Sequence, residues 1–238
     1  MLSTVILAIY VVVFLLLSLP YLAIVKLVRV IGLKNVHEKM LEVFVQFFGK
    51  SVIRVVGANV EVEGLENLPK GNVLFVGNHQ SYADIPIMLG FIPGVKSFIA
   101  KKETRRIPVV SWWMVEINCV FLDRQNLRQG MKDMAKAKEF LQEGRSMVIY
   151  PEGTRSQNDD MGEFKKGSLK IAQQANVPVV PVAILGSYKL YEQQKKIKKA
   201  EVKLTIGEPI FIEKLSKEEQ KEIAEIAENR VRIMLKST

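Results

Sequence analysis

The stretch Val73-Leu74-Phe75-Val76-Gly77-Asn78-His79-Gln80-Ser81-Tyr82-Ala83-Asp84 carries the clearest structural signal in the chain. Residues 73–76 form a short apolar run rich in β-branched side chains, which is typical of a buried strand. His79 and Asp84 are therefore expected where a strand ends and a helix begins. An imidazole suits proton transfer near neutral pH, and an aspartate on one ring nitrogen leaves the other free to take a proton. The alternative is a loop-capping histidine and an aspartate at a helix N-terminus.

From residue 59 onward, short apolar runs alternate with helical patterns. The strand candidates are 59–63, 72–77, 95–100, 118–122, 146–150, 178–185 and 201–206. The helix candidates are 82–90, 107–116, 126–143, 166–176 and a last helix that begins with a capping box of Ser216 and Glu219. This alternation predicts an α/β domain over residues 58–238, with a mostly buried sheet flanked by helices.

Residues 1–57 have a different composition. Residues 5–25 are almost wholly apolar, which is about the length that crosses a bilayer, and no secretory signal pattern is visible. Pro20 leaves about 15 helical residues ahead of it, roughly 22 Å, so a bent span and a hairpin dipping into one leaflet both stay open. Residues 36–56 mix apolar side chains with scattered charges, as interfacial helices do. We expect residues 1–57 to be a membrane-embedded helical element.

The charges that follow the apolar run indicate its orientation. Lys26, Arg29 and Lys34 have no acid among them, which places this flank on the cytoplasmic side. We therefore expect the inner (cytoplasmic) membrane as the location, with residues 58–238 on the cytoplasmic face. His37 is expected to be a membrane-interface residue and not a ligand. The basic run 195–199 is expected at a solvated hairpin tip, with contact to anionic lipid as the alternative.

The net charge of +9 calls for a polyanionic partner, which means nucleic acid, anionic membrane or a phosphorylated substrate. No nucleic-acid-binding motif is recognisable. A single cysteine, Cys119, excludes an intramolecular disulfide, and with only two histidines a zinc site is not expected. Cys119 is expected to be buried in the middle of a strand. Ser81 is expected to cap a helix and not to act as a nucleophile, since the chain has no Gly-x-Ser-x-Gly elbow.

A second polar constellation follows the strand candidate 146–150. In Pro151-Glu152-Gly153-Thr154-Arg155-Ser156, the glycine lets the backbone approach a ligand, and turn N–H groups can form an anion-binding concavity. Arg155 offers a planar, bidentate grip on phosphate. Arg124 follows another strand candidate, and ligands gather at such strand ends in open α/β sheets. These residues predict an anion site near the His–Asp pair.

Four blocks of the chain, in this order, resemble those of the glycerolipid acyltransferase family, and most closely its bacterial 1-acyl-sn-glycerol-3-phosphate acyltransferases. The blocks are Asn78–Asp84, Phe121–Arg124, Tyr150–Ser156 and Val177–Val182, within a similarity that covers residues 60–190. The segments Lys101–Glu103 and Phe164–Gly167 also resemble the family. Ser111 and Asn118 stand where the family commonly has glycine. Asparagine tolerates left-handed backbone angles, so the turn at Asn118 is expected to survive.

The resemblance implies transfer of a fatty acyl group from a thioester to the free sn-2 hydroxyl of lysophosphatidic acid, giving phosphatidic acid. His79 would be the general base, and Asp84 would orient it. The implied substrate-binding residues are Lys101, Arg124, Glu152, Gly153, Thr154 and Arg155. The block 177–182 would help form the acyl-donor side. The donor would be acyl-coenzyme A or an acylated acyl carrier protein, and neither a cofactor nor a metal is implied.

Three other functions stay open on the sequence. An acyltransferase of the same superfamily could act on glycerol 3-phosphate or another lysophospholipid, a lipid hydrolase would use water as the acceptor, and the charge alone suggests a membrane-tethered nucleic-acid-binding protein. Backbone N–H groups after His79 are candidate donors to the oxyanion. Four basic side chains either form a rim for the lipid phosphate or face solvent; these are Lys101, Lys102, Arg105 and Arg106.

Overall fold

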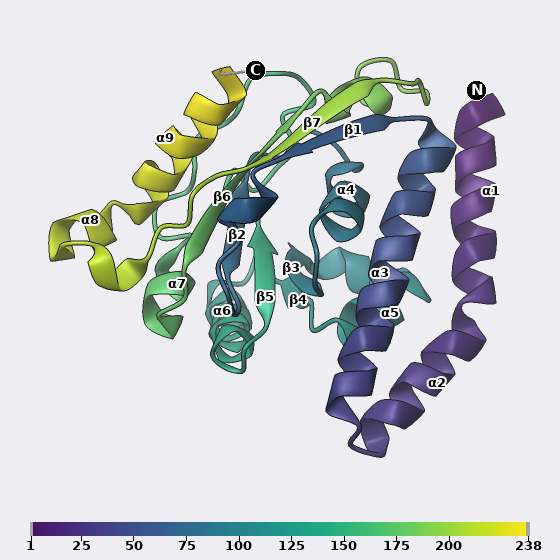
Figure 1. Cartoon of the computed structure of the whole chain (residues 1–238), viewed down its shortest axis with the longest axis horizontal. Coiled ribbons are helices and arrows are strands. Elements are labelled where there is room, and N and C mark those ends of the chain that lie inside the picture. The colour runs from purple at the N-terminus through teal and green to yellow at the C-terminus, as the bar shows by residue number, and fades with distance from the viewer. Residues whose placement is uncertain (1, 237–238) are drawn as a thin grey trace.

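A computed structural model describes residues 2–236 of the chain. Within them, seven strands form one mixed sheet in the order β1-β7-β6-β2-β5-β3-β4 (Figure 1). The strands are β1 (Asn59–Glu63), β2 (Leu74–Gly77), β3 (Lys96–Lys101), β4 (Val120–Leu122), β5 (Ser146–Ile149), β6 (Val179–Leu185) and β7 (Glu201–Ile206). The five strands from β6 to β4 are mutually parallel, and β7 pairs with β6 in the antiparallel direction. β1 runs parallel to β7.

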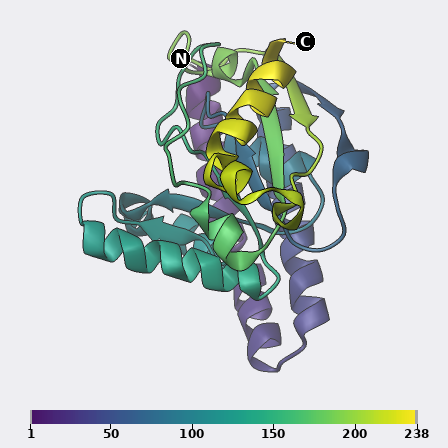
Figure 2. The same ribbon diagram turned by 90° about the vertical axis from the view of Figure 1, so that its left-hand side faces the viewer.

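Helices cover both faces of the sheet (Figures 1 and 2). One face carries α1 (Leu2–Leu17), α2 (Leu19–Val30), α3 (Lys34–Val56), α4 (Asp84–Phe91) and α5 (Val110–Glu116). The other carries α6 (Leu127–Gln142), α7 (Lys170–Ala175) and α9 (Ile223–Lys236), with α8 (Lys217–Lys221) leading into α9. In β2, Phe75 packs toward the first set of helices, while Leu74 and Val76 pack toward the second. Burial on both faces explains the unbroken apolar run, and the predicted α/β fold with flanking helices is confirmed.

The fourth strand is shorter than predicted. β4 begins at Val120, so Cys119 lies just before the strand and the expected mid-strand position is wrong. Its thiol is buried, as expected, and its Sγ accepts a hydrogen bond from Phe98 N (3.2 Å). Asn118 adopts a φ of 58°, so the turn survives without glycine, as predicted. The last helix is broken into α8 and α9, and the capping box of Ser216 and Glu219 is confirmed at α8.

The N-terminal helices form a hairpin along one side of the molecule (Figure 1). α1 and α2 are bent by 42° relative to each other, and Pro20 lies in the first turn of α2, where its missing N–H is tolerated. Among the described residues, no single helix has the length and apolarity to cross a bilayer; α1 and α2 taken together do, by length and composition only. Gly57, with a φ of 79°, ends α3 two residues before β1 begins.

An ion-pair cluster around the buried Glu116 carboxylate connects α2 and α3 to α5. His37 Nε2 lies 3.0 Å from Glu116 Oε1, and Arg29 Nη1 lies 3.1 Å from the same oxygen. His37 and Glu116 are both buried, so the expectation of a membrane-interface residue at His37 is wrong. The reason is a carboxylate 79 positions away, which draws the imidazole inward. Trp113 Nε1 adds a hydrogen bond to Ser18 Oγ (2.8 Å).

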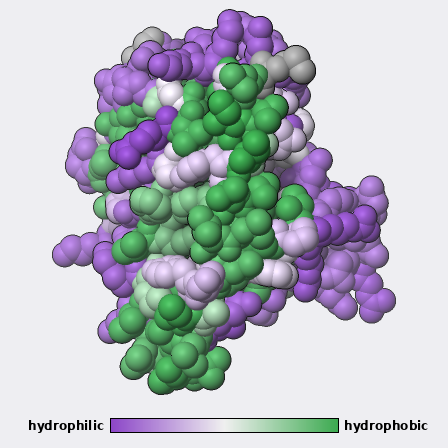
Figure 3. Space-filling view, turned by 90° about the vertical axis from the view of Figure 1, so that its right-hand side faces the viewer, coloured by the Kyte–Doolittle hydropathy of each residue, from purple (hydrophilic) through white to green (hydrophobic). Residues whose placement is uncertain are grey.

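The outer surface of the hairpin is apolar. Figure 3 shows a continuous hydrophobic area over the side of the molecule on which α1 and α2 lie. Its exposed side chains include Val5, Ile6, Ile9, Val12, Leu16, Leu17, Ile24, Leu27 and Val30. An apolar area of this extent marks a contact with another molecule or with lipid.

Candidate active site

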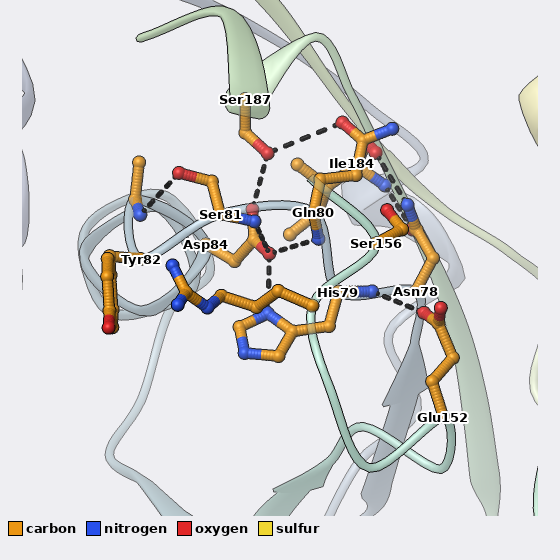
Figure 4. A network of polar contacts seen from close by, with 12 residues as sticks. Asn78, His79, Gln80, Ser81, Tyr82, Asp84, Glu152, Ser156, Ile184 and Ser187 are labelled. Atoms are coloured by element: carbon orange, nitrogen blue, oxygen red, sulfur yellow. Dashed lines mark hydrogen bonds and ion pairs between the residues drawn. The ribbon is translucent and has the colours of Figure 1, made fainter. Parts of the chain in front are cut away.

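The polar residues predicted from the sequence follow strands that end at the same edge of the sheet. His79 follows β2, residues 152–155 follow β5, Lys101 ends β3 and Arg124 follows β4. These strands are parallel neighbours, so their carboxyl ends form one rim, where ligands of open α/β sheets bind. At the end of β2, Asn78 exchanges two hydrogen bonds of 2.8 Å with the backbone of Ile184 in β6 (Figure 4).

His79 and Asp84 form a hydrogen-bonded pair, with 2.7 Å between Nδ1 and Oδ2 (Figure 4). The Asp84 carboxylate has no exposed surface and lies at the first residue of α4. Its Oδ2 also accepts from the backbone N–H groups of Gln80 (2.8 Å) and Ser81 (2.9 Å), and its Oδ1 accepts from Ser187 Oγ (2.6 Å). Because Oδ2 can only accept, Nδ1 carries the proton, and the lone pair of Nε2 is left free.

The imidazole ring is also fixed from its flat side. The Tyr150 ring stacks on it, with centroids 4.1 Å apart and an angle of 11° between the planes. Burial raises the pKa of the Tyr150 phenol well above its usual value, and the nearby charge of Asp84 adds to the effect. Tyr150 therefore stays neutral near pH 7. The His79 side chain keeps 18% of its surface exposed, so a substrate can reach it.

Glu152 connects the loops that follow β2 and β5. Its Oε1 accepts from the backbone N–H of His79 (2.6 Å), and its Oε2 accepts from that of Gly162 (2.8 Å). Ser156 N donates to the carbonyl oxygen of His79 (2.8 Å) and adds a further link. Burial raises the pKa of the Glu152 carboxyl, while the two backbone hydrogen bonds lower it. Both carboxylate oxygens of Glu152 thus accept hydrogen bonds from backbone N–H groups of the protein itself.

Two cations converge over Gly153. Arg124 Nη1 donates a hydrogen bond to the Gly153 carbonyl oxygen. A methyl group placed on Gly153 would lie 2.7 Å from Lys165 Nζ and 3.8 Å from Arg124 Nη1, and the φ of 77° disfavours any side chain there. Lys165 lies beside Gly153 and Arg124, two of the predicted residues, although the sequence did not single it out. The signal for it was present, because Lys165 belongs to the segment 164–167 that resembles the family.

A small polar cavity of about 290 Å³ lies at the ends of β3 and β4. It is lined by Lys101, Glu103, Leu122, Arg124 and Gln125. Of the four basic side chains considered for a rim, Lys102 forms an ion pair with Asp123 (2.8 Å) and Arg105 lies 5.7 Å from the centroid of Phe121. Thr154 is exposed on the loop after β5.

Arg155 is held by a carboxylate that sequence reasoning missed. Its Nη1 lies 2.7 Å from Glu192 Oε1, and its guanidinium lies 3.4 Å from the centroid of the Tyr82 ring. Glu192 is buried, and it also accepts from Tyr82 N (2.9 Å) and Ser81 Oγ (2.7 Å). The expectation that Ser81 caps a helix is wrong, because its hydroxyl donates to Glu192 and accepts from Ala83 N (3.0 Å) while α4 begins later.

The backbone N–H groups after His79 already have acceptors within the protein. Those of Gln80 and Ser81 donate to Asp84, that of Tyr82 donates to Glu192, and that of Ala83 donates to Ser81 Oγ. The expectation that this stretch supplies the oxyanion donors is therefore not met by residues 80–83 in this structure.

An apolar cavity of about 490 Å³ opens beside the His79 loop. It is lined by Thr4, Leu7, Ala8, Val11, Val12, Val52, Ile53, Val56, Ser81, Tyr82, Ala83, Pro86, Leu190, Tyr191 and Ile197. The lining comes from α1, α3, the start of α4 and the connection between β6 and β7. Thr4 Oγ1 accepts from Ile197 N (3.1 Å) and fastens α1 to that connection. Helix α1 is thus a cavity wall on one side and part of the exposed apolar surface on the other.

Comparison with known proteins identifies the family. A family model described as Acyltransferase matches residues 59–185. A protein of Mycoplasma pneumoniae named "Probable 1-acyl-sn-glycerol-3-phosphate acyltransferase" is 35% identical over 217 residues, which cover 83% of this chain and 79% of that protein. The chain belongs to the acyltransferase family. The matched region contains His79, Asp84, Arg124 and Arg155, and the resemblance seen in the sequence is confirmed.

Two further acyltransferases resemble this one. The crystal structure of the 1-acyl-sn-glycerophosphate (LPA) acyltransferase PlsC from Thermotoga maritima has a TM-score of 0.77 and 33% identity, covering 94% of this chain and 95% of that one. The 1-acyl-sn-glycerol-3-phosphate acyltransferase of Saccharomyces cerevisiae is 34% identical over 177 residues, which are 72% of this chain and 58% of the yeast protein. The fold of this acyltransferase therefore extends beyond the family-model region and includes the N-terminal hairpin.

Proposed function

We propose that this acyltransferase moves a fatty acyl group from a thioester to the sn-2 hydroxyl of lysophosphatidic acid, giving phosphatidic acid. The names of its relatives support this acceptor. The observation that carries the chemistry is the His79–Asp84 pair, a partly exposed imidazole fixed at 2.7 Å by a fully buried carboxylate. Cations and an apolar cavity lie on the same rim of the sheet, which suits a lipid with an anionic headgroup.

In the proposed reaction, His79 Nε2 takes the proton of the acceptor hydroxyl as its oxygen attacks the thioester carbonyl carbon. The C–S bond then breaks, and the departing thiolate takes the proton from the imidazolium. Asp84 stabilises the positive charge on the ring while that charge exists. General base catalysis of this kind contributes about 10²–10⁴-fold to the rate. A thioester is already activated, so the proposal needs no covalent enzyme intermediate, metal or cofactor.

For the headgroup, we assign the phosphate to the cations around Gly153 and the adjoining polar cavity. Arg124 and Lys165 lie over Gly153, Lys101 lines the cavity with Arg124, and Arg155 presents a guanidinium from the same loop. Guanidinium groups bind phosphate oxygens in pairs, which fixes the orientation of the acceptor as well as its affinity. Thr154 and Glu152 belong to the same loop, and Glu152 positions it by accepting hydrogen bonds from the backbone N–H groups of His79 and Gly162.

For the lipid tails and the membrane, we propose that residues 1–57 embed in the cytoplasmic leaflet of the inner membrane and that residues 58–238 lie on its cytoplasmic face. The support is the exposed apolar side of α1 and α2, the bend of 42°, and the basic residues after the apolar run. Lysophosphatidic acid keeps its acyl chain in lipid and its phosphate at the interface. An apolar cavity with α1 as its wall would let a tail pass from the bilayer toward His79.

The test is a panel of acceptors and donors on the purified full-length protein. The acceptors are lysophosphatidic acid, glycerol 3-phosphate and lysophosphatidylcholine, and the donors are acyl-coenzyme A and acylated acyl carrier protein. We expect phosphatidic acid with at least one donor and the highest kcat/KM for lysophosphatidic acid. A preference for glycerol 3-phosphate or for lysophosphatidylcholine would overturn the proposed acceptor. Free fatty acid without phosphatidic acid would indicate a hydrolase.

A further inference from the structure

Glu192 is a buried carboxylate that the proposed reaction does not use. It lies two residues after the short helix η3 (Ser187–Leu190), in the connection between β6 and β7. Its side chain has no exposed surface, and its two oxygens accept from Arg155, Tyr82 N and Ser81 Oγ at 2.7 to 2.9 Å. Burying a charge is costly unless it is paired and hydrogen-bonded. The three contacts supply that pairing, and all of them lead to the candidate active site.

The first consequence concerns the orientation of Arg155. Glu192 holds the guanidinium through Nη1, and the Tyr82 ring supports its flat face at 3.4 Å. One nitrogen is thus used for positioning, and the other N–H donors stay available to an anion. A free arginine side chain samples many rotamers, so holding it in one plane removes an entropic cost from substrate binding.

The second consequence concerns the loop of the general base. Glu192 fixes the turn at Ser81 and Tyr82, and the N–H groups of Gln80 and Ser81 in turn hold the carboxylate that orients His79. One carboxylate therefore connects the arginine assigned to the phosphate with the loop that carries the base. It adds to the links that Glu152 and Ser156 make between the same two loops.

We infer that Glu192 is a positioning residue of the active site, which orients Arg155 toward the acceptor phosphate without touching the substrate. The inference rests on the proposed function, because it requires a phosphorylated acceptor. It leads to a specific expectation: loss of the Glu192 charge weakens the binding of the phosphorylated acceptor and leaves the binding of the thioester unchanged.

The test is E192Q, which keeps the size of the side chain. The amide oxygen can still accept from Tyr82 N, and the amide nitrogen can donate to Ser81 Oγ, but the charge that holds Arg155 is gone. We expect KM for lysophosphatidic acid to rise about tenfold, with kcat within about threefold and KM for the thioester unchanged. In an R155A background the same substitution should have no further effect on that KM, because the two residues act as one unit.

A matched control is E42Q on α3. Glu42 also pairs with a cation, Lys39 (2.9 Å), and also accepts a backbone N–H, that of Gly94 (3.1 Å), but it does not line either cavity. E42Q should leave both KM values unchanged. A second variant, R155K, covers the case in which E192Q does not fold. Lysine keeps the charge but cannot lie flat on Tyr82 while reaching Glu192, so the same rise in KM is expected.

Three results would overturn the inference while the unmodified protein remains active. The first is an E192Q variant with a lower melting temperature and an unchanged KM for lysophosphatidic acid. The second is an effect of E192Q on that KM that adds to the effect of R155A. The third is an E192Q variant that does not fold, together with an R155K variant whose KM for lysophosphatidic acid is unchanged. If the unmodified protein does not acylate lysophosphatidic acid, the proposed function itself fails. The two failures are thus distinguished by the unmodified protein.

Discussion

The substitution Asp84→Asn isolates the charge that is proposed to support His79 as the general base. Three N–H donors converge on Oδ2, whereas Oδ1 receives only the rotatable hydroxyl of Ser187. An asparagine therefore places its oxygen at the Oδ2 position and its nitrogen toward Ser187 Oγ. The hydrogen bond from His79 Nδ1 is kept, and so is the tautomer. What is lost is the attraction between the carboxylate and the His79 imidazolium that the proposed mechanism forms during turnover.

The size of the loss follows from the geometry. With 2.7 Å between Nδ1 and Oδ2, the two charge centres lie about 4 Å apart, which is worth about 4 kcal/mol at an effective dielectric constant near 20. At 1.36 kcal/mol for each factor of ten, kcat should fall about 10³-fold. KM for lysophosphatidic acid should change little, because Asp84 is buried behind the ring. The free energy of unfolding should stay within about 1 kcal/mol, since the hydrogen bonds are retained.

The assay measures thiol release from the acyl thioester at saturating acceptor, together with chemical denaturation of each variant. The matched control is Asp133→Asn on α6, since Asp133 also accepts a backbone N–H, that of Asp123 (2.9 Å), on the other face of the sheet. Its kcat should equal that of the unmodified protein. A folded Asp84→Asn variant that keeps kcat within about tenfold would refute the role given to the buried charge.

Four further predictions concern the proposed phosphate site and the cysteine. Arg155→Ala should raise KM for lysophosphatidic acid by about 10–100-fold, the cost of lost charged hydrogen bonds, and an unchanged KM would mean that the phosphate is held elsewhere. Gly153→Ala should lower the free energy of unfolding by about 1–2 kcal/mol and also raise KM for lysophosphatidic acid. The control is Gly94→Ala, at a φ of 81° with open space around it, which should lower the free energy of unfolding and leave this KM unchanged. An unchanged KM in Gly153→Ala would argue against close binding of the phosphate at Gly153. Burial raises the pKa of Cys119 to about 12, so its thiol should react with a maleimide at pH 8 only after unfolding, and equal rates in the folded and unfolded protein would contradict this. Because the folded pKa lies above the usual 9, the stability that the neutral thiol contributes is full below pH 9 and should decline from there toward pH 12 in denaturation curves.

Much of the fold could be predicted because its signals are local. The apolar run at residues 73–76 gave β2, the capping box at Ser216 gave the start of α8, and the five-residue separation of His79 and Asp84 was short enough to predict their contact. The bend near Pro20 was also predictable, since proline removes a helical hydrogen bond.

What the sequence did not reveal depends on distant partners. Glu192 lies 111 positions from Ser81 and 37 from Arg155. A glutamate in a polar stretch of sequence is expected to be exposed to solvent, so the pattern gave no sign that Glu192 is buried. His37 was misassigned for the same reason, because the burial of its ring depends on Glu116 in another helix. The N–H groups after His79 looked free in the sequence, and only the three-dimensional arrangement shows that Asp84 and Glu192 occupy them.

The central claim is that the His79 imidazole takes the proton from a lipid hydroxyl. The most direct measurement is kcat of the purified His79→Ala variant, reconstituted in the same lipid vesicles as the unmodified protein. The substrates are lysophosphatidic acid and the thioester donor that the unmodified protein prefers. We predict a fall of at least about 10²-fold and up to about 10⁴-fold, with the melting temperature and the vesicle-bound fraction unchanged. A folded, vesicle-bound His79→Ala protein that turns over within tenfold of the unmodified rate would contradict the claim.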